Sequence, residues 1–280
     1  MTEYENILVE TGDGVGTITL NRPEKLNAWT GKMEKEVAQA MTSAEHDDNV
    51  RVIILTGAGR GFCAGADMSN LDSLAGAAGG DREQIAASLR ERFAGPRREG
   101  ARPDFQKTYS YFPAIDKPIL GAINGAAAGL GMVISLYCDM RFASDAAKFS
   151  TAFSRRGLIA EYGISWLLPR LVGVANALDL LYTARLVDAQ EALRMGLVSR
   201  VIPAEQFAAE VRKYALELAN SVSPRSLRVI KEQVYNALFQ SLGEAIDTAN
   251  QEMIKSFASE DFKEGVAHYL AKRPPAFTGK

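Results

Sequence analysis

The sequence predicts an α/β fold with a helical C-terminal part, and three observations predict it. The β-rich run RVIILTG at residues 51–57 contains an unbroken apolar stretch, which is typical of a strand covered on both faces. Residues 118–139 combine apolar residues with closely spaced glycines, which indicates a strand, a tight turn and then a helix. From Pro203 onward the patterns are helical only, and residues 205–220 and 226–238 are amphipathic.

The first elements follow from local signals. An Asp-Gly turn at residues 12–14 separates two β-rich runs, residues 6–11 and 14–20, and predicts a hairpin. A helix is expected from about Gly31 to Glu45, before the strand at 51–57. Residues 75–104 contain AGAAGG and a run of arginines, so we expect a mobile insertion around a short helix.

The later elements repeat the order of strand, turn and helix. Short strands are expected at residues 139–144 and 147–150, followed by helices near Ile164 to Leu171 and Ala175 to Thr183. Two further signals mark helix starts: the sequence Asp188-Ala189-Gln190-Glu191 resembles a capping box, and Ser223-Pro224 supplies an N-cap with proline at the first helical position.

The apolar segment at 118–139 could also be a membrane helix, because it is nearly long enough to span a bilayer and carries small residues at four-residue spacing. Asn124 and the four glycines between Gly121 and Gly131 favour the strand, turn and helix instead. A composition of 47% hydrophobic and 24% charged residues is typical of a globular protein. We therefore expect no membrane partner.

The net charge and the first residues of the chain indicate which binding partners and which cellular location to expect. The net charge of -2 argues against a nucleic-acid partner. Five arginines crowd one segment, interrupted by Glu91 and Glu99, and they form either a solvated helix and loop or an anion site: Arg90, Arg92, Arg97, Arg98 and Arg102. The opening residues 1–10 contain no basic stretch followed by an apolar one, so the cytoplasm is the expected location.

The cysteines and histidines exclude some chemistry. Cys63 and Cys138 stand in apolar surroundings without CxxC spacing, which predicts buried free thiols. The sequence has 2 histidines, and His46 lies in a polar stretch. A metal centre or a Ser-His-Asp triad is therefore not expected, and acid-base work falls to carboxylates.

Two glycine-rich turns, one ending near Asp67 and the other at Leu130, follow the two buried strands. Backbone N–H groups at the start of a helix have no internal partner, so these turns could hold an oxyanion. The alternative is that they are only tight turns in a crowded core. Residues 59–64 also fit the dinucleotide fingerprint G-x-G-x-x-G/A, but the following FCAGADMSN is a poor helix start, which disfavours a nicotinamide enzyme.

A larger set of motifs, taken in order, resembles the crotonase superfamily of enoyl-CoA hydratases and isomerases. The motifs are RPEKLNA (22–28), LTGAGRGFCAGAD (55–67), AINGAAAGLGM (122–132), SLYCD (135–139), KFS (148–150), GLIAEYG (157–163) and LPRLVG (168–173). The resemblance implies a crotonase-like spiral of repeated ββα units in residues 1–202 and a helical oligomerisation region in residues 203–280. It also implies a homotrimer or a homohexamer.

The resemblance further implies an acyl-CoA substrate, with coenzyme A as part of that substrate and no separate cofactor or metal. By position, the backbone N–H groups of Ala66 and Leu130 would form an oxyanion hole for the thioester oxygen. The positions implied along the CoA are Lys25, Leu26, Ala28, Ala64, Asp67 and Met68. Asp67 could equally be a structural cap.

The acids decide the reaction, because this scaffold hosts several reactions. Hydratases of the family carry two glutamates, and the matching positions here are Val133 and Phe153, which transfer no proton. The remaining acid is Glu161, in an otherwise apolar stretch. Isomerases of the peroxisomal type resemble this chain here and have a catalytic glutamate at the matching position. A ring-modifying isomerase branch has aspartate at the same place. An ion pair with Arg155 or Arg156 is the alternative role for Glu161.

Together these features predict a single-acid isomerase, in which Glu161 moves a proton between two carbons while the two amides stabilise a dienolate. Apolar surroundings should raise the pKa of Glu161. Val133, Phe153, Tyr162 and Trp166 would line the acyl pocket, or serve as core packing. Two other functions stay open: a hydratase or lyase that recruits water differently, and a non-catalytic CoA-binding protein.

Overall fold

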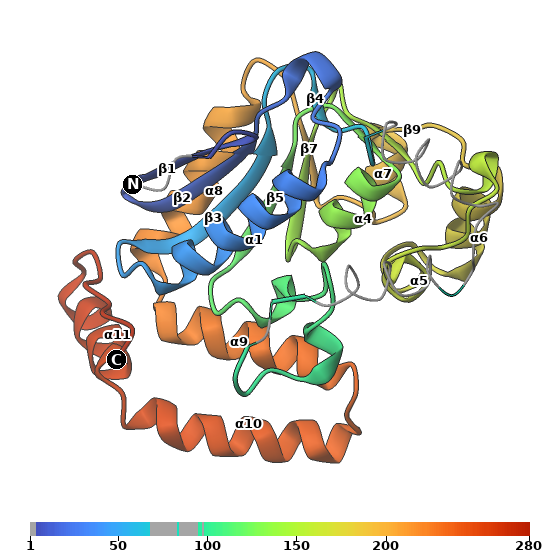
Figure 1. Cartoon of the computed structure of the whole chain (residues 1–280). Helices are drawn as coiled ribbons and strands as arrows, with labels where there is room; N and C mark the ends of the chain where they lie inside the picture. The colour runs from blue at the N-terminus through green and yellow to red at the C-terminus, as the bar shows by residue number, and fades with distance from the viewer. Residues whose placement is uncertain (1–3, 68–82, 84–94, 97) are drawn as a thin grey trace.

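The computed structural model describes residues 4–67, 83, 95–96 and 98–280, arranged as Figure 1 shows. The larger sheet has six strands in the order β1 (Ile7–Gly12), β2 (Gly14–Leu20), β3 (Val50–Gly57), β5 (Ile119–Ile123), β7 (Met140–Ser144) and β10 (Arg200–Ile202). Only β1 and β2 pair antiparallel within it, and the other neighbours are parallel. Most of the insertion predicted at 75–104 lies outside the described residues.

The helices of the described chain follow the predicted positions closely. They are α1 (Gly31–His46), α4 (Leu130–Tyr137), α5 (Ile164–Val172), α6 (Val174–Thr183), α7 (Ala189–Arg194), α8 (Phe207–Ser221), α9 (Pro224–Ala237), α10 (Leu242–Phe257) and α11 (Glu260–Ala271). Short 3-10 turns occur at Pro23–Lys25, Pro103–Phe105, Phe112–Ala114 and Ser154–Arg156.

The N-terminal hairpin forms as predicted. Asp13 and Gly14 both have positive φ angles, 56° and 83°. Two successive residues with positive φ are what a tight turn between strands of right-handed twist requires, and Asp-Gly adopts this geometry at low cost. The pairing then runs from Gly12 opposite Val15 to Ile7 opposite Leu20.

Strand β3 is covered on both faces, which explains its unbroken apolar sequence. Ile53 and Leu55 belong to the core cluster that includes α1, whereas Val52 and Ile54 belong to the cluster that includes α8. Successive side chains of a strand point to opposite faces. The two helices therefore sandwich the larger sheet, and the prediction of a doubly covered strand is confirmed.

A second, smaller sheet carries the site turns. It contains β4 (Gly61–Cys63), β6 (Ala126–Ala128), β8 (Lys148–Ser150) and β9 (Val187–Asp188), in that order. The pairs β3/β4, β5/β6 and β7/β8 each place their first strand in the larger sheet and their second in the smaller one. This alternation produces the spiral that the motifs implied.

Residues 118–139 differ from the prediction in one respect, because β6 replaces part of the expected turn between β5 and α4. The three alanines of β6 carry little strand propensity and are held by pairing with β4 and β8. Residues 59–64 also contain strand β4, so the dinucleotide fingerprint opens no helix. No helix in the described part of the chain is both long and apolar enough to cross a bilayer.

The two predicted helix starts differ in detail. Ser223 caps α9, with its hydroxyl accepting from the Ser226 N–H and Pro224 at the first position, as predicted. Asp188 caps α7 by accepting from the Glu191 N–H. The Glu191 carboxylate instead pairs with Arg185, so the reciprocal half of the capping box is replaced by an ion pair.

The C-terminal helices divide into two groups. Helix α8 packs on the larger sheet, whereas α10 has no buried residue and lies away from the sheet beneath α9 (Figure 1). The last strand ends at Ile202, where the predicted helical region begins. The division into 1–202 and 203–280 stays a prediction, and α8 belongs by packing to the core of the first part.

Candidate active site

Three chain turns meet at one edge of the smaller sheet. Strands β4, β6 and β8 are parallel neighbours, so their carboxyl ends lie at the same edge. Ala66 follows β4, Leu130 begins α4 just after β6, and Phe153 follows β8. The backbone N–H of Gly129 donates to the Ser150 carbonyl at 2.9 Å, which ties the second turn to the third. The topology thus brings together segments that are far apart in sequence.

Glycines allow the first two turns to touch through their backbones. A Cβ atom on Gly65 would lie 3.0 Å from the Ala128 carbonyl oxygen and 3.8 Å from the Leu130 nitrogen, and its φ is 106°. A Cβ on Gly131 would lie 2.0 Å from the Cys63 carbonyl oxygen. No side chain fits at either position, so these glycines are required by the close approach of the two turns.

Among the described residues, the two predicted amides have no hydrogen-bond acceptor. Around Ala66 the neighbouring groups are used, because Gly65 O accepts from Trp29 N at 2.7 Å and Asp67 N donates to Trp29 O at 3.0 Å. Leu130 is the first residue of α4 and its N–H has no acceptor within the helix. Within the described residues neither amide donates a hydrogen bond. Both therefore suit an oxyanion, and the helix dipole favours negative charge at Leu130.

The predicted CoA-binding residues cluster along one loop. Lys25 ends an exposed 3-10 turn, and the carbonyl of Leu26 accepts from the Ala64 N–H at 2.9 Å, which places the loop at 25–28 beside Ala64. Buried Asn27 holds the loop by donating to the carbonyls of Ala58 and Gly61. Met68 lies outside the described residues, so its predicted contact has no structural counterpart.

Asp67 has a structural partner. Its carboxylate accepts from Arg22 Nη1 at 2.9 Å, and the same guanidinium nitrogen donates to the Ala28 carbonyl at 2.6 Å. Both side chains are largely buried. The pair therefore clamps the 25–28 loop onto the turn that carries Ala66. This supports the structural role for Asp67 over a direct contact with CoA.

Glu161 lies half-buried in the turn before α5, between Ala160 and Tyr162, which pack against the main core cluster. Burial raises the pKa of its carboxyl group above the ordinary value. In the described residues no cation pairs with it: Arg155 donates to the Thr183 carbonyl and Arg156 to the Ala152 carbonyl. The ion pair considered as its alternative role is therefore absent from the described residues.

Aromatic residues surround the turn that carries Glu161. Tyr162 packs edge-on against Tyr109 with ring centroids 5.1 Å apart, and Tyr109 packs against Trp29 at 6.0 Å. The hydroxyl of Tyr137, at the end of α4, donates to the Tyr162 carbonyl at 2.8 Å. Sequence reasoning missed Tyr137 and Tyr109, because no local pattern pairs them with residue 162.

The other predicted pocket residues differ in position. Val133 is buried in α4 and Phe153 is buried after β8, both within the main core cluster. Trp166 stacks on Phe239 at 5.5 Å and lies under the Arg170 guanidinium at 4.0 Å. Trp166 is partly buried and both ring partners are exposed, so its role in the acyl pocket stays a prediction.

Some of the remaining candidate groups have structural contacts, whereas Arg90, Arg92 and Arg97 of the arginine cluster lie outside the described residues. Cys63 and Cys138 are buried free thiols, as predicted, and burial raises the pKa of each to about 12. Arg98 pairs with Glu45, and Arg102 lies over the Phe239 ring. In the part of the chain described, no group of His, Cys, Asp or Glu side chains is arranged to hold a metal ion.

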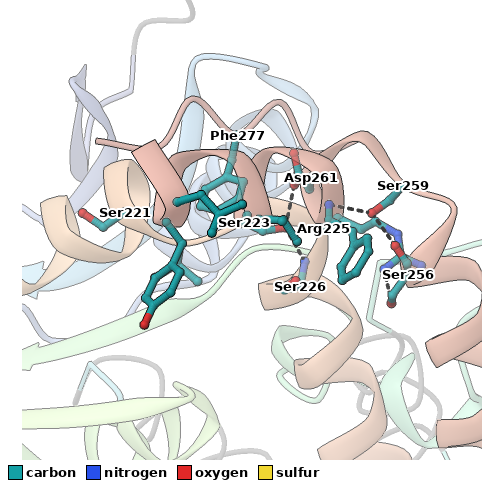
Figure 2. Close-up of a pocket in the computed structure, with 14 residues that line it drawn as sticks. Ser221, Ser223, Arg225, Ser226, Ser256, Ser259, Asp261 and Phe277 are labelled. Carbon is teal, nitrogen blue, oxygen red and sulfur yellow. Dashed lines mark hydrogen bonds between the residues drawn. The ribbon is translucent and has the colours of Figure 1, made fainter. Parts of the chain in front are cut away.

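A separate hollow of about 520 Å³ lies among the C-terminal helices (Figure 2). Ser223 donates to buried Asp261 at 2.5 Å on its wall, and Arg225 donates to Ser256. The rest of its lining includes apolar residues of α11 such as Val266 and Leu270. None of the predicted site residues lines this hollow, so it is distinct from the site at the turns.

The chain resembles known proteins over its whole length. The family model described as enoyl-CoA hydratase/isomerase matches residues 10–78 and 72–280. The chain is 37% identical over 278 residues to 1,2-epoxyphenylacetyl-CoA isomerase of Escherichia coli K12, covering 99% of both chains. It is 36% identical over 275 residues to a probable enoyl-CoA hydratase of Mycobacterium bovis, covering 98% of both. A solved enoyl-CoA hydratase from Bacillus anthracis superposes with a TM-score of 0.85 at 31% identity, covering 99% of this chain and 100% of the other.

Proposed function

The chain belongs to the enoyl-CoA hydratase/isomerase family of enzymes, and from that premise we propose that it shifts a carbon–carbon double bond within an enoyl-CoA thioester. Glu161 is the proposed proton carrier, and the N–H groups of Ala66 and Leu130 form the proposed oxyanion hole. One relative is named an isomerase and several are named hydratases. The choice between the two reactions therefore depends on the acids of this chain.

The half-buried carboxyl of Glu161, which has no cation beside it among the described residues, carries the proposal. Its carboxyl is half-buried, its pKa is raised by burial, and no described cation neutralises it. A residue that must both take and return a proton works best with a pKa closer to neutrality. Val133 and Phe153, at the positions of the two hydratase glutamates, have apolar side chains that activate no water.

The proposed steps use these groups in turn. Glu161 takes a proton from C2 of a 3-enoyl-CoA, and the electrons of that C–H bond delocalise onto the thioester oxygen as a dienolate. The two N–H groups stabilise the negative charge on this oxygen. Glu161 then returns the proton to C4, the double bond moves from C3=C4 to C2=C3, and the carboxylate is regenerated.

Incubation with two substrates tests this reaction. The protein is given cis-3-hexenoyl-CoA and, separately, trans-2-hexenoyl-CoA, and products are separated by liquid chromatography. We expect 3-enoyl-CoA to become 2-enoyl-CoA faster than 2-enoyl-CoA gains water. Efficient hydration without isomerisation would make the protein a hydratase with unusual water activation. Binding of both esters with no turnover would make it a non-catalytic CoA-binding protein.

The proposed reaction needs no resident metal or nicotinamide. One carboxyl and two backbone amides supply all the proton transfer and charge stabilisation that the steps require. Dialysis against EDTA should therefore leave the isomerase rate unchanged. Loss of activity that a divalent cation restores would contradict this part of the proposal.

We also propose that the protein is a homotrimer or homohexamer held by its C-terminal helices. Apolar side chains stand exposed on α10 and α11, including Leu242 at 78% and Leu270 at 75% exposure. Exposed apolar surface of this kind is typical of an interface. Light scattering should give a mass three or six times 30.4 kDa. A mass of one chain across micromolar concentrations would overturn this proposal.

A further inference from the structure

The hydroxyl of Tyr137 is placed against the turn that carries Glu161. It donates to the Tyr162 carbonyl at 2.8 Å, and a Cβ atom on Gly163 would lie 2.7 Å from the same oxygen. Tyr137 is buried, with 8% of its surface exposed. Burial also raises the pKa of this phenol to about 12, so it stays a neutral hydrogen-bond donor throughout the working range of an enzyme.

The turn itself adopts a conformation that needs support. Tyr162 and Gly163 have φ angles of 51° and 79°, both in the left-handed region. A bulky residue rarely adopts this region, and such a conformation persists where surrounding contacts hold it. Tyr162 is contacted by the Tyr137 hydroxyl from α4 and, edge-on, by the Tyr109 ring from the turn at residues 108–111. The Glu161 carbonyl accepts from the Ile164 N–H at 3.1 Å, which joins the turn to α5.

Helix α4 connects this turn to the oxyanion hole. It begins at Leu130, whose N–H is one of the two proposed amides, and ends at Tyr137. At a rise of about 1.5 Å per residue, its two ends are roughly 10 Å apart. All of its residues are buried, so it is a rigid spacer between the two groups.

We propose that Tyr137 is a positioning residue: through its hydrogen bond to the Tyr162 carbonyl it sets the place of the Glu161 carboxyl relative to the oxyanion hole at the other end of α4. This inference rests on the proposed role of Glu161. Tyr137 touches no reacting atom in this scheme. It acts by holding the turn closed, which also keeps Glu161 in its desolvated surroundings.

Tyr137→Phe removes the hydroxyl and keeps the ring, so it tests the proposal with cis-3-hexenoyl-CoA as substrate. We expect kcat to fall by about tenfold, the scale of one lost hydrogen bond, with KM changed by less than about twofold. The acid limb of the kcat against pH profile should move to lower pH, because a loosened turn admits water and lowers the pKa of Glu161.

Tyr235→Phe is the matched control. The Tyr235 hydroxyl also donates from a largely buried position, to Asp139 at 2.9 Å, but it contacts no residue of the Glu161 turn among those described. This variant should lose thermal stability while keeping the wild-type kcat and pH profile. If both variants change the kinetics alike, Tyr137 contributes only to general stability and the proposal fails.

Gly163→Ala disturbs the same contact from the other residue, and this single variant is measured by itself if Tyr137→Phe does not fold. Its methyl group would press on the Tyr137 hydroxyl, and alanine at the left-handed φ of 79° adds backbone strain of its own, so kcat and the acid limb should change in the same direction. In the double variant that hydroxyl is absent, so the two effects should be less than additive. Additive effects would show that the two residues do not act through the same contact.

The outcomes separate this inference from the proposed function. If Glu161→Gln keeps full activity, Glu161 is not the acid and both ideas fail. If Glu161→Gln is inactive while Tyr137→Phe keeps the wild-type kcat and pH profile, Glu161 is retained and only the positioning role is overturned.

Discussion

The two parts of the proposed site are built in different ways. The amide part, residues 64–67 and 129–131, consists of backbone groups held by contacts in which Gly65 and Gly131 admit no side chain. The acid part, residues 161–163, presents one carboxyl on a turn held by aromatic side chains. The amide part therefore depends on chain geometry, whereas the acid part depends on the identity of a single side chain.

This difference explains how one scaffold serves several reactions. Stabilisation of a thioester oxygen needs only two correctly placed N–H groups, which no substitution of an exposed side chain removes. Proton transfer depends on which positions around the oxyanion hole carry an acid. In this chain Val133 and Phe153 carry none, and Glu161 does. The two parts should therefore respond differently to mutation.

Removing the acid should have the largest effect on rate. Glu161→Gln keeps size and hydrogen bonding but removes the titratable proton, so kcat should fall by roughly 10²–10⁴. Binding of the CoA ester, measured by calorimetry, should stay close to wild type. Glu10→Gln, at an exposed position of β1, is the control and should keep full activity. An active Glu161→Gln enzyme would place the proton carrier elsewhere.

Adding one methyl group to the amide part should damage the fold itself. Gly131→Ala would set a Cβ against the Cys63 carbonyl oxygen, and the free energy of unfolding should drop by about 3 kcal/mol, at the upper end for overpacking. Gly31→Ala is a matched control, since nothing lies within 4 Å of its Cβ. Chemical denaturation measures both. Equal stability of the two variants would contradict the backbone contact.

Substitution of Asp67 tests whether this residue of the amide part has a structural role or binds the CoA. If its main task is the ion pair with Arg22, Asp67→Asn should lower the free energy of unfolding by about 1–2 kcal/mol and change KM less than about twofold. Asp13→Asn breaks an exposed pair with Arg212 and should cost less. A large rise in KM with unchanged stability would instead show that Asp67 contacts the CoA.

The smallest expected effect is on the pH dependence of the free energy of unfolding. Burial raises the folded-state pKa of Glu161 above its unfolded value. Below about pH 4 the carboxyl is protonated in both the folded and the unfolded state, so it does not change the free energy of unfolding. As the pH rises, the unfolded chain loses this proton first, so the free energy of unfolding falls until the pH passes the folded-state pKa.

A glutamine side chain does not ionise, so its burial does not lower the free energy of unfolding as the pH rises. Glu161→Gln should therefore melt at a slightly higher temperature than wild type at pH 7 and at the same temperature below about pH 4. Calorimetric scans at the two pH values measure the difference. A variant that is less stable at pH 7 would mean that the ionised carboxylate makes a stabilising contact in the folded protein.

Local sequence patterns predicted much of the fold and part of the site. The hairpin at Asp13, the doubly covered β3 and the capped start of α9 each depend on residues adjacent in sequence, and each is confirmed. Strand β6 was missed because its three alanines are held by neighbouring strands rather than by propensity. The capping box predicted at residues 188–191 is incomplete because the Glu191 side chain forms an ion pair with Arg185 instead.

The sequence by itself determined which groups are present: two glycine-rich turns after strands, a single carboxyl in an apolar stretch, and apolar residues where hydratases carry acids. Tertiary structure alone decided which of them meet. The parallel pairing of β4 with β6 brings the turns of Ala66 and Leu130 together, and the Tyr137 hydroxyl reaches the turn of Glu161 across the core. Propensity and hydrophobic period act over a few residues, whereas these contacts depend on strand register and helix packing, which only the folded chain defines.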